Sequence, residues 1–273
     1  MEKMSQSKSS SSMRWPSGRM SRLLGCYARE IRWIATRPPT LAASVALFRH
    51  TLNHHIGNWI GSRPTVDRVM LSTGLGRPVI LRPGAGDLAV FYEVFAERAY
   101  EVDEQDLPSQ SVHLIVDCGA HIGFSALYFA SRYPNARIAA IEPSPDNYDL
   151  LVKNTAHESR IQRLCACVGE SDGRRCLDTS GPAWSHHLAE IGVPVDCLSL
   201  VSLRRALGQP IDLLKVDVEG AEVGLLKDHG ARAIVAELHG GYTPHEFARD
   251  VQPLKVKRSR RRVDTFQAID AGP

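Results

Sequence analysis

The chain lacks several features that would assign it to a class at once. It has no run of about 20 apolar residues, the length a bilayer-spanning helix needs, and its longest uncharged apolar run near the N-terminus covers only Leu41 to Phe48. The six cysteines form no CxxC pair and show no zinc-ligand spacing, so we expect reduced, buried thiols. A formal net charge of +3 over 273 residues is too small to favour nucleic acid as a partner. We therefore expect a cytoplasmic protein with no transmembrane segment.

What is present is the composition of an ordinary globular protein, with 43% apolar and 23% charged residues. Residues 1–18 are rich in Ser and Lys and predict a disordered tail. Residues 19–65 predict a helical extension that packs on the core, because apolar residues recur there at three- and four-residue steps. Contact of the basic first helix with a membrane surface is the alternative. Pro38-Pro39 should break this segment into two helices. Residues 66–273 would then form the main domain.

Strands and helices alternate along the main domain. A β-hairpin over 66–82 and a helix over 88–100 come first. Strands are predicted at 114–116, 137–141, 163–168, 213–216 and 233–238, and helices at 124–131, 146–156 and 221–228. A hairpin-like stretch is predicted at 174–200 and closing strands at 255–269. Continuous apolar strands alternating with helices predict an α/β fold with a doubly wound, Rossmann-like sheet.

A glycine-rich loop follows the first of these strands, in the segment Val116-Asp117-Cys118-Gly119-Ala120-His121-Ile122-Gly123. Its glycines allow a sharp turn and a close approach of a ligand, and the following helix offers free N–H groups to an anionic group. Glu142, at the end of the next strand, is placed to accept hydrogen bonds from both hydroxyls of a ribose. The loop and this second acid together predict an adenosine-bearing cofactor.

The charge pattern favours S-adenosylmethionine over NAD as that cofactor. A dinucleotide loop has the spacing GxGxxG around a pyrophosphate, whereas here an acid, Asp117, precedes glycines at 119 and 123. An acid at that place suits the cationic ammonium group of S-adenosylmethionine. An NAD-dependent oxidoreductase remains the alternative, as does a non-catalytic binding module on the same fold.

The loop resembles that of the FkbM-type methyltransferases, S-adenosylmethionine enzymes often found modifying hydroxyls of secondary metabolites and glycans. Three further stretches resemble the same family: Leu81-Arg82 through Asp87 to Tyr100, Ile141-Glu142-Pro143-Ser144-Pro145 to Asn154, and Asp212 to Glu222. The resemblance covers roughly residues 78 to 240. It implies a seven-stranded methyltransferase sheet, and it implies that Asp117, Gly119, Ala120, His121, Gly123, Glu142 and Pro143 bind the cofactor. His121 departs from the family, which usually has asparagine there.

Three further residues are predicted to serve the acceptor. Asp217 ends the fourth strand, which should lie beside the first, so it could accept the acceptor's proton or orient its hydroxyl. Glu219 could share that role or cap the following helix. His239 ends the fifth strand and could be a base or a hydrogen-bonded loop residue. These three side chains and Glu237 could hold a metal, but nothing in the spacing demands one and we predict none.

Other polar residues have simpler expected roles. Lys215 lies within an apolar strand and should pair with a carboxylate. The basic residues of 255–262 should form a solvated sheet edge rather than an anion site. The doublet His186-His187 could face a substrate or lie on the surface. We expect O-methylation of a small-molecule or glycan acceptor, while the acceptor itself and the oligomeric state stay open.

Overall fold

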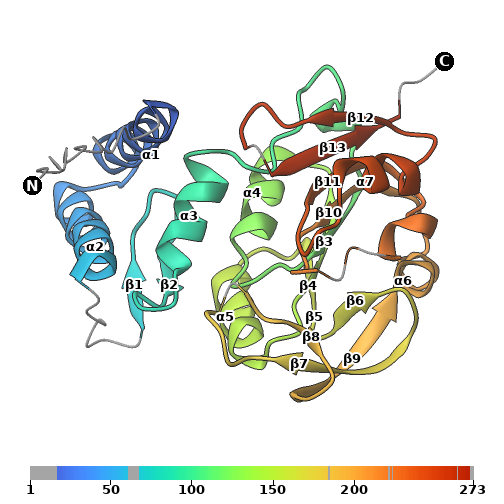
Figure 1. Ribbon diagram of the computed structural model, residues 1–273. Coiled ribbons are helices and arrows are strands. Elements are labelled where there is room, and N and C mark those ends of the chain that lie inside the picture. Colours follow the sequence, from blue (N-terminus) through green and yellow to red (C-terminus); the bar gives the residue numbers. More distant parts are fainter. Residues whose placement is uncertain are drawn as a thin grey trace, which may run out of the picture.

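A seven-stranded sheet forms the centre of the protein in its computed structural model, which describes residues 17–60, 68–183, 185–220, 222, 224–262 and 264–270. The strand order is β12-β13-β11-β10-β3-β4-β5 (Figure 1). The strands are β3 (Leu114–Cys118), β4 (Arg137–Ile141), β5 (Ile161–Leu164), β10 (Ile211–Val216), β11 (Ala231–Glu237), β12 (Lys255–Arg258) and β13 (Thr265–Ile269). β13 is antiparallel to both β11 and β12, and the other pairings are parallel. The predicted doubly wound sheet of seven strands is confirmed.

Helices cover both faces of this sheet, because successive residues of each strand point to opposite faces. On one face lie α3 (Asp87–Phe95), α4 (Phe124–Arg132) and α5 (Pro145–Thr155), packed on a layer that includes Ile115 of β3. On the other lie α6 (Leu200–Leu207), the 3-10 helix η2 (Leu225–Asp228) and α7 (Pro244–Asp250), packed on a layer that includes Leu114 and Val116. A short 3-10 helix, η1 (Ser109–Ser111), precedes β3. The alternation from Leu114 to Val116 shows why this part of β3 is apolar on both faces.

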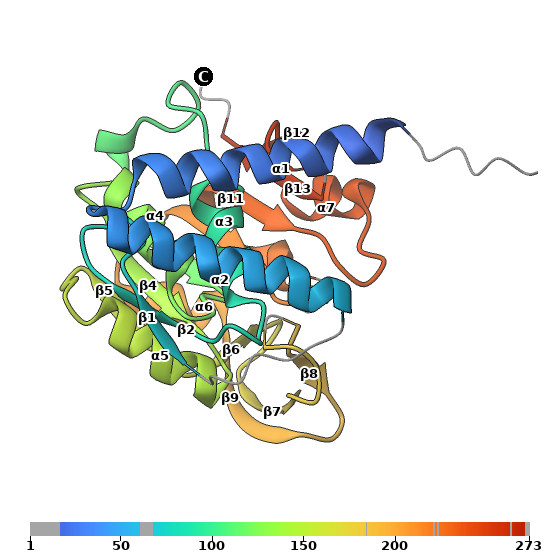
Figure 2. The same cartoon turned by 90° about the vertical axis from the view of Figure 1, so that its left-hand side faces the viewer.

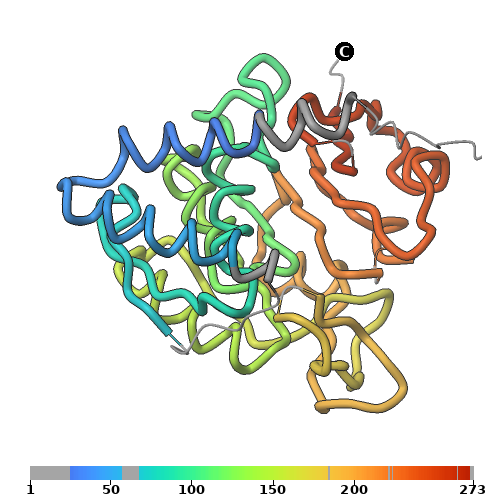
Figure 3. The backbone as a smooth tube through the Cα atoms, turned by 60° about the vertical axis from the view of Figure 1, so that its left-hand side comes forward, coloured from blue at the N-terminus to red at the C-terminus, as the bar shows by residue number. Residues whose placement is uncertain are grey.

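The N-terminal helices α1 (Ser17–Thr36) and α2 (Leu41–Ile60) lie side by side next to α3 and the hairpin of β1 (Val69–Leu71) and β2 (Val79–Leu81), as Figures 2 and 3 show. The chain turns between them at Pro38-Pro39, as predicted. Trp33 joins α1 to the core, since its Nε1 donates a hydrogen bond to the carbonyl oxygen of Thr73 at 2.7 Å and its ring meets Phe91 edge-on. Residues 1–16 of the predicted tail lie outside the described residues.

A second, four-stranded sheet adjoins the first and has the order β6-β9-β7-β8. Its strands are β6 (Cys167–Gly169), β7 (Gly173–Asp178), β8 (His187–Ala189) and β9 (Val193–Ser199). The prediction of one strand over 163–168 is wrong, because β5 ends at Leu164 and β6 pairs with β9 in the other sheet. The apolar run through Ala166 conceals this crossing. The antiparallel hairpin predicted within 174–200 is confirmed in the pairing of β7 with β9.

Three other predictions need correction. The helix predicted over 221–228 is the 3-10 helix η2, preceded by Gly224 in a left-handed conformation (φ 81°) that ends any helix running through it. α6 and α7 were not predicted, although Ser199 and Thr243 cap their first turns. Cys165 is exposed and two other cysteines are half-buried, although all six thiols are free as expected.

No helix in the described part of the chain is long and apolar enough to cross a membrane.

Candidate active site

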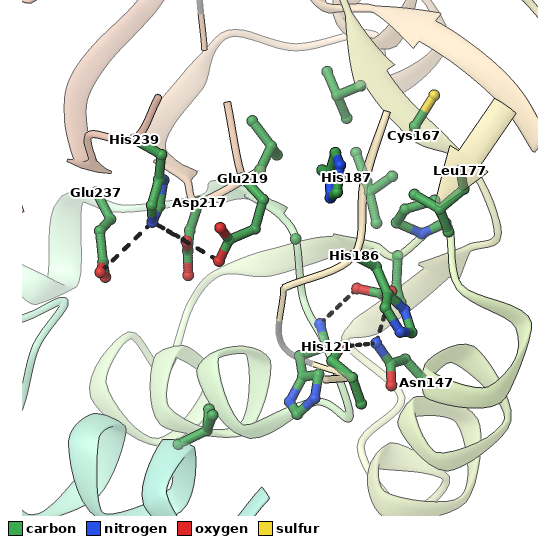
Figure 4. A pocket seen from close by; sticks show the side chains of 18 of the residues that line it. His121, Asn147, Cys167, Leu177, His186, His187, Asp217, Glu219, Glu237 and His239 are labelled. Atoms are coloured by element: carbon green, nitrogen blue, oxygen red, sulfur yellow. Dashed lines mark hydrogen bonds and ion pairs between the residues drawn. The ribbon is translucent and has the colours of Figure 1, made fainter. Parts of the chain in front are cut away.

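A cavity of about 420 Å³ opens where β4 and β10 end. Ligands of doubly wound sheets bind at this edge, where the strand order reverses. One wall is apolar and comes largely from the second sheet, with Cys167, Leu177 and Leu188 as examples. The opposite end carries carboxylates and His239, and Figure 4 shows these two regions on either side of the view. The cavity therefore has an apolar region and a charged region at opposite ends.

Gly119 brings the loop after β3 against the end of β10. Its φ is 80°, and a Cβ at this position would lie 1.9 Å from the carbonyl oxygen of Asp217. No other residue fits such an approach without moving one of the two strands. Gly119 and His121 line the cavity, whereas the predicted cofactor residues Ala120 and Gly123 lie in the loop without lining it.

His121 has a backbone reason to stand where the family usually has asparagine. Its φ is 51°, in the left-handed region, where asparagine and histidine are both enriched among residues with a side chain. Its Nε2 lies 3.4 Å from Oδ1 of Asp87, and burial lowers the pKa of the imidazole to about 4 despite this carboxylate. His121 is therefore neutral at neutral pH, as an asparagine would be.

Glu142 is held rigidly at the end of β4. Its Oε2 accepts a hydrogen bond from the backbone N–H of His121 at 2.9 Å, and its Oε1 accepts from the N–H of Ser144 at 3.0 Å and from Nδ2 of Asn147 at 3.1 Å. The side chain lines the cavity although it is only 5% exposed, and Pro143 lines the cavity beside it. Burial raises the pKa of this carboxyl above its usual value, against the pull of these donors.

A hydrogen-bond network that begins before β3 supports Glu142, and the sequence did not reveal this network. Arg82 pairs with the fully buried Asp87 through Nε at 3.0 Å, and its Nη2 donates to Oδ1 of Asn147 at 2.7 Å. Asn147 in turn donates to Glu142. The resemblance of the stretch from Arg82 to Asp87 to the family was a signal that this segment matters. Its contact with Asn147 could not be predicted, because residues 65 positions apart show no spacing pattern.

Asp117 lies beneath the loop rather than in the cavity. It is fully buried, its Oδ2 accepts from Oγ of Ser125 at 2.6 Å, and its Oδ1 lies 3.4 Å from Nζ of Lys215. Burial alone would lower the pKa of Lys215, but the charges of Asp217 and Asp117 raise it, so the amine is protonated. The expected carboxylate partner of Lys215 is therefore confirmed. The expected contact of Asp117 with a ligand stays a prediction, because Asp117 lies beside Lys215 and does not itself line the cavity.

Asp217, Glu219 and His239 come together, as the sequence predicted. Nε2 of His239 lies 3.8 Å from Oδ1 of Asp217 and 3.8 Å from Oε1 of Glu219, and 3.7 Å from Oε1 of Glu237. Its Nδ1 lies 2.8 Å from Oε1 of Glu222. Burial lowers the pKa of His239, but these carboxylates outweigh it and raise the pKa to about 11. A pKa in this range keeps the ring protonated at neutral pH.

Two residues that contact Asp217 and Glu237 were missed. Tyr100 donates its hydroxyl to Oδ2 of Asp217 at 2.7 Å, and no local pattern links residues 117 positions apart. Arg262 was assigned to a solvated edge, but it lines the cavity and its guanidinium pairs with Glu237 at 3.2 Å and Glu93 at 2.5 Å. Strand β12 itself is the sheet edge, as expected. His186 and His187 both line the cavity from the side of the second sheet.

A family model described as a methyltransferase FkbM domain matches residues 117–255. The chain belongs to the FkbM methyltransferase family. It is similar to Methyltransferase sdnD of Sordaria araneosa, with 32% identity over 177 residues that cover 50% of this chain and 67% of that one. It is also similar to Methyltransferase 1 of Beauveria bassiana, with 27% identity over 168 residues that cover 50% and 64%.

Among solved structures, a methyltransferase from Geobacter sulfurreducens aligns with 94% of this chain and 97% of its own, at a TM-score of 0.41 and 13% identity. About one third of the length of each of these curated relatives lies outside the part that aligns. Family membership therefore rests on the FkbM match and on the curated relatives.

Proposed function

We propose that this FkbM family member transfers a methyl group from S-adenosylmethionine to a hydroxyl of a small metabolite or sugar. The observation that carries the proposal is Glu142, a carboxylate fixed by three hydrogen bonds at the end of β4, facing a cavity with an apolar wall. Such a carboxylate can accept hydrogen bonds from both ribose hydroxyls of a nucleoside. The family supports the methyltransferase activity, while the hydroxyl acceptor is our inference.

The residues present fit an adenosine-bearing cofactor. Apolar side chains of the second sheet, such as Cys167, Val168 and Leu177, offer a dry surface beside Glu142 for a purine ring. Gly119 and His121 bring backbone close to the same space. The carboxylates at the far end favour a ligand that carries positive charge over one with a pyrophosphate, which is why NAD fits less well.

The chain's own residues would position the acceptor and exclude water. S-adenosylmethionine supplies an electrophilic methyl group on a sulfonium when bound. Transfer is an in-line displacement, so the main task of the protein is to hold the acceptor oxygen opposite the sulfur–methyl bond. Asp217 is the best placed acceptor-side carboxylate, because Tyr100 and Lys215 fix its Oδ2 and leave Oδ1 toward the cavity. It would hold the acceptor's hydroxyl proton.

Calorimetry with S-adenosylhomocysteine tests the cofactor. We expect binding by the wild-type chain and none of NAD at the same concentration. Glu142→Gln should weaken binding of S-adenosylhomocysteine by roughly 5- to 150-fold, because a hydrogen bond to a charged group contributes about 1–3 kcal/mol. The matched control is Glu190→Gln, which removes an exposed carboxylate between β8 and β9 and should leave binding unchanged.

A transfer assay with isotopically labelled S-adenosylmethionine and a panel of hydroxylated metabolites and sugars tests the acceptor. Failure of wild type to bind S-adenosylhomocysteine at millimolar concentration would overturn the proposal. Binding of NAD in its place would favour an oxidoreductase. Binding of the cofactor product without transfer to any nucleophile would favour a non-catalytic binding module.

A further inference from the structure

His239 stands at the centre of an unusual set of oxygen atoms. Its Nε2 faces one oxygen each of Asp217, Glu219 and Glu237 at 3.7–3.8 Å (Figure 4). These distances are too long for hydrogen bonds, which join N and O at about 2.7–3.2 Å. Two ligands about 2.1 Å from one octahedral ion lie about 3.0 Å apart when adjacent and about 4.2 Å apart when opposite. The observed 3.7–3.8 Å falls between these two separations, so small side-chain rotations would bring these atoms around one ion.

The other ring nitrogen of His239 is already committed. Nδ1 lies 2.8 Å from Oε1 of Glu222, whose side chain is fully buried and whose Oε2 has no hydrogen-bond partner among the described residues. A histidine that binds a metal through one nitrogen almost always donates its other N–H to a carboxylate or carbonyl. Glu222 is thus an independent sign that Nε2, rather than Nδ1, is the functional atom.

The cluster also carries more negative than positive charge. Four carboxylates, those of Asp217, Glu219, Glu222 and Glu237, surround one imidazole. Lys215 lies 3.5 Å from Asp217, and Arg262 lies 3.2 Å from Glu237. Glu219 and Glu222 have His239 as their shared partner. Like charges held this closely in a partly buried site favour binding of a further cation.

We propose that Asp217, Glu237 and His239 bind a divalent metal cation, with Glu219 beside it as a further oxygen ligand. Each of these three residues offers one ligand atom, a carboxylate oxygen or an imidazole nitrogen, and the three atoms lie within 4.8 Å of one another. Two carboxylates suit Mg²⁺ or Mn²⁺, and the imidazole shifts the preference toward Mn²⁺. The side chains are 13–22% exposed and line the cavity, which leaves room for water or a substrate oxygen on the ion. The sequence had predicted no metal, since spacing alone did not require one.

The ion would serve the acceptor if the proposed methyl transfer holds. A hydroxyl bound to the ion would lose its proton to solvent more readily, because the cation stabilises the alkoxide. Asp217, as a ligand, would then hold the ion rather than the acceptor's proton. His239 would then act as a ligand, which agrees with its position among carboxylates better than a base would. This role rests on the proposed function, whereas binding of the ion itself does not.

Electron paramagnetic resonance with Mn²⁺ tests the site without cofactor or acceptor. Free hexaaqua Mn²⁺ gives a sharp signal that disappears when the ion binds protein. After treatment with a chelator, the full chain should bind a single Mn²⁺. His239→Gln should weaken binding at least about 100-fold, and Glu222→Gln about 10- to 100-fold, since loss of an orienting partner costs that much affinity. Asp196→Asn, an exposed carboxylate on β9, is the control of equal charge change and should bind as wild type does.

Melting curves show whether each variant folds, and Glu237→Gln replaces any variant that does not. Wild type that leaves the Mn²⁺ signal unchanged, or His239→Gln that binds as tightly as wild type, would overturn the site. Calorimetry with S-adenosylhomocysteine on the same samples separates the two proposals. Cofactor binding without Mn²⁺ binding rejects the metal alone, and Mn²⁺ binding without cofactor binding rejects the proposed function alone.

Discussion

His121→Asn should remove a defined part of the protein's pH dependence. Burial lowers the pKa of His121 from 6.5 to about 4, against the charge of Asp87 and with that of Arg82 and Lys215. The unfolded chain therefore takes up this proton at a higher pH than the folded chain does. The contribution of His121 is complete above pH 6.5 and is lost as the pH falls toward 4. Asparagine accepts the left-handed backbone at this position but has no proton to gain.

The magnitude follows from the gap between the two pKa values. At 1.36 kcal/mol for each pH unit, wild type should lose about 2 kcal/mol of unfolding free energy by pH 5 from this group, and about 3 kcal/mol by pH 4. The side chain is 12% exposed, so solvent screening changes this little. Groups that His121 does not contact contribute equally in both proteins and cancel when the two curves are subtracted.

Urea denaturation at pH 7, 6, 5 and 4 measures the difference between the two proteins. We expect the unfolding free energy of His121→Asn relative to wild type to rise by about 3 kcal/mol from pH 7 to pH 4. His157→Asn changes an exposed histidine and should give a curve parallel to that of wild type. Parallel curves for His121→Asn would refute the reasoning, because they would show that the imidazole is protonated as easily in the folded chain as in the unfolded one.

Two further changes test the packing of the site by melting temperature and denaturant unfolding. Gly119→Ala should abolish stable folding or displace β10, because its Cβ would meet the backbone of Asp217. The control Gly76→Ala has the same φ of 80° but no atom within 4 Å of its Cβ, so it should lower the unfolding free energy by only about 1–2 kcal/mol. Equal effects of the two changes would contradict the close approach. Tyr100→Phe should lower the unfolding free energy by about 1.5–3 kcal/mol, because the hydrogen bond to Asp217 is lost. The control Tyr148→Phe removes only a 3.5 Å contact and should change the unfolding free energy by no more than about 0.5 kcal/mol. The reverse order would show that the Tyr100 hydroxyl contributes nothing to stability.

The sheet and the strand-end residues were predictable because they follow local rules. Apolar runs alternating with helices fix a parallel sheet, and ligand-facing residues then lie after the strands. Glu142, Asp217 and His239 follow β4, β10 and β11 in this way, and all three line the cavity. The second sheet was less predictable. Its first strand, β6, continues the apolar run of β5, and hydrophobicity alone does not distinguish burial in one sheet from burial in the next.

The chemical role of His239 was not predictable, and the reason is physical. The sequence placed it after β11 and left it as a base or a loop residue. Its protonation and its ability to bind a metal depend on four neighbouring carboxylates. One of them, Glu222, belongs to a segment that was predicted as a regular helix. A pKa raised to about 11 results from that assembly, so it cannot be inferred from any one motif. The three carboxylate oxygens around Nε2 and the contact of Nδ1 with Glu222 make a metal ligand the role that we test.

The working site extends beyond the segment that matches the FkbM model. Arg82 and Asp87 lie before residue 117, yet they hold Asn147 and, through it, Glu142 in the cavity. Tyr100 lies before the match and Arg262 after it, and they fix Asp217 and Glu237 at the charged end of the cavity. Each half of the cavity is thus oriented by side chains from outside the matched core. Because rigid positioning decides the rate of an in-line transfer, differences in acceptor among such proteins should arise in these flanking segments as much as in the shared motifs.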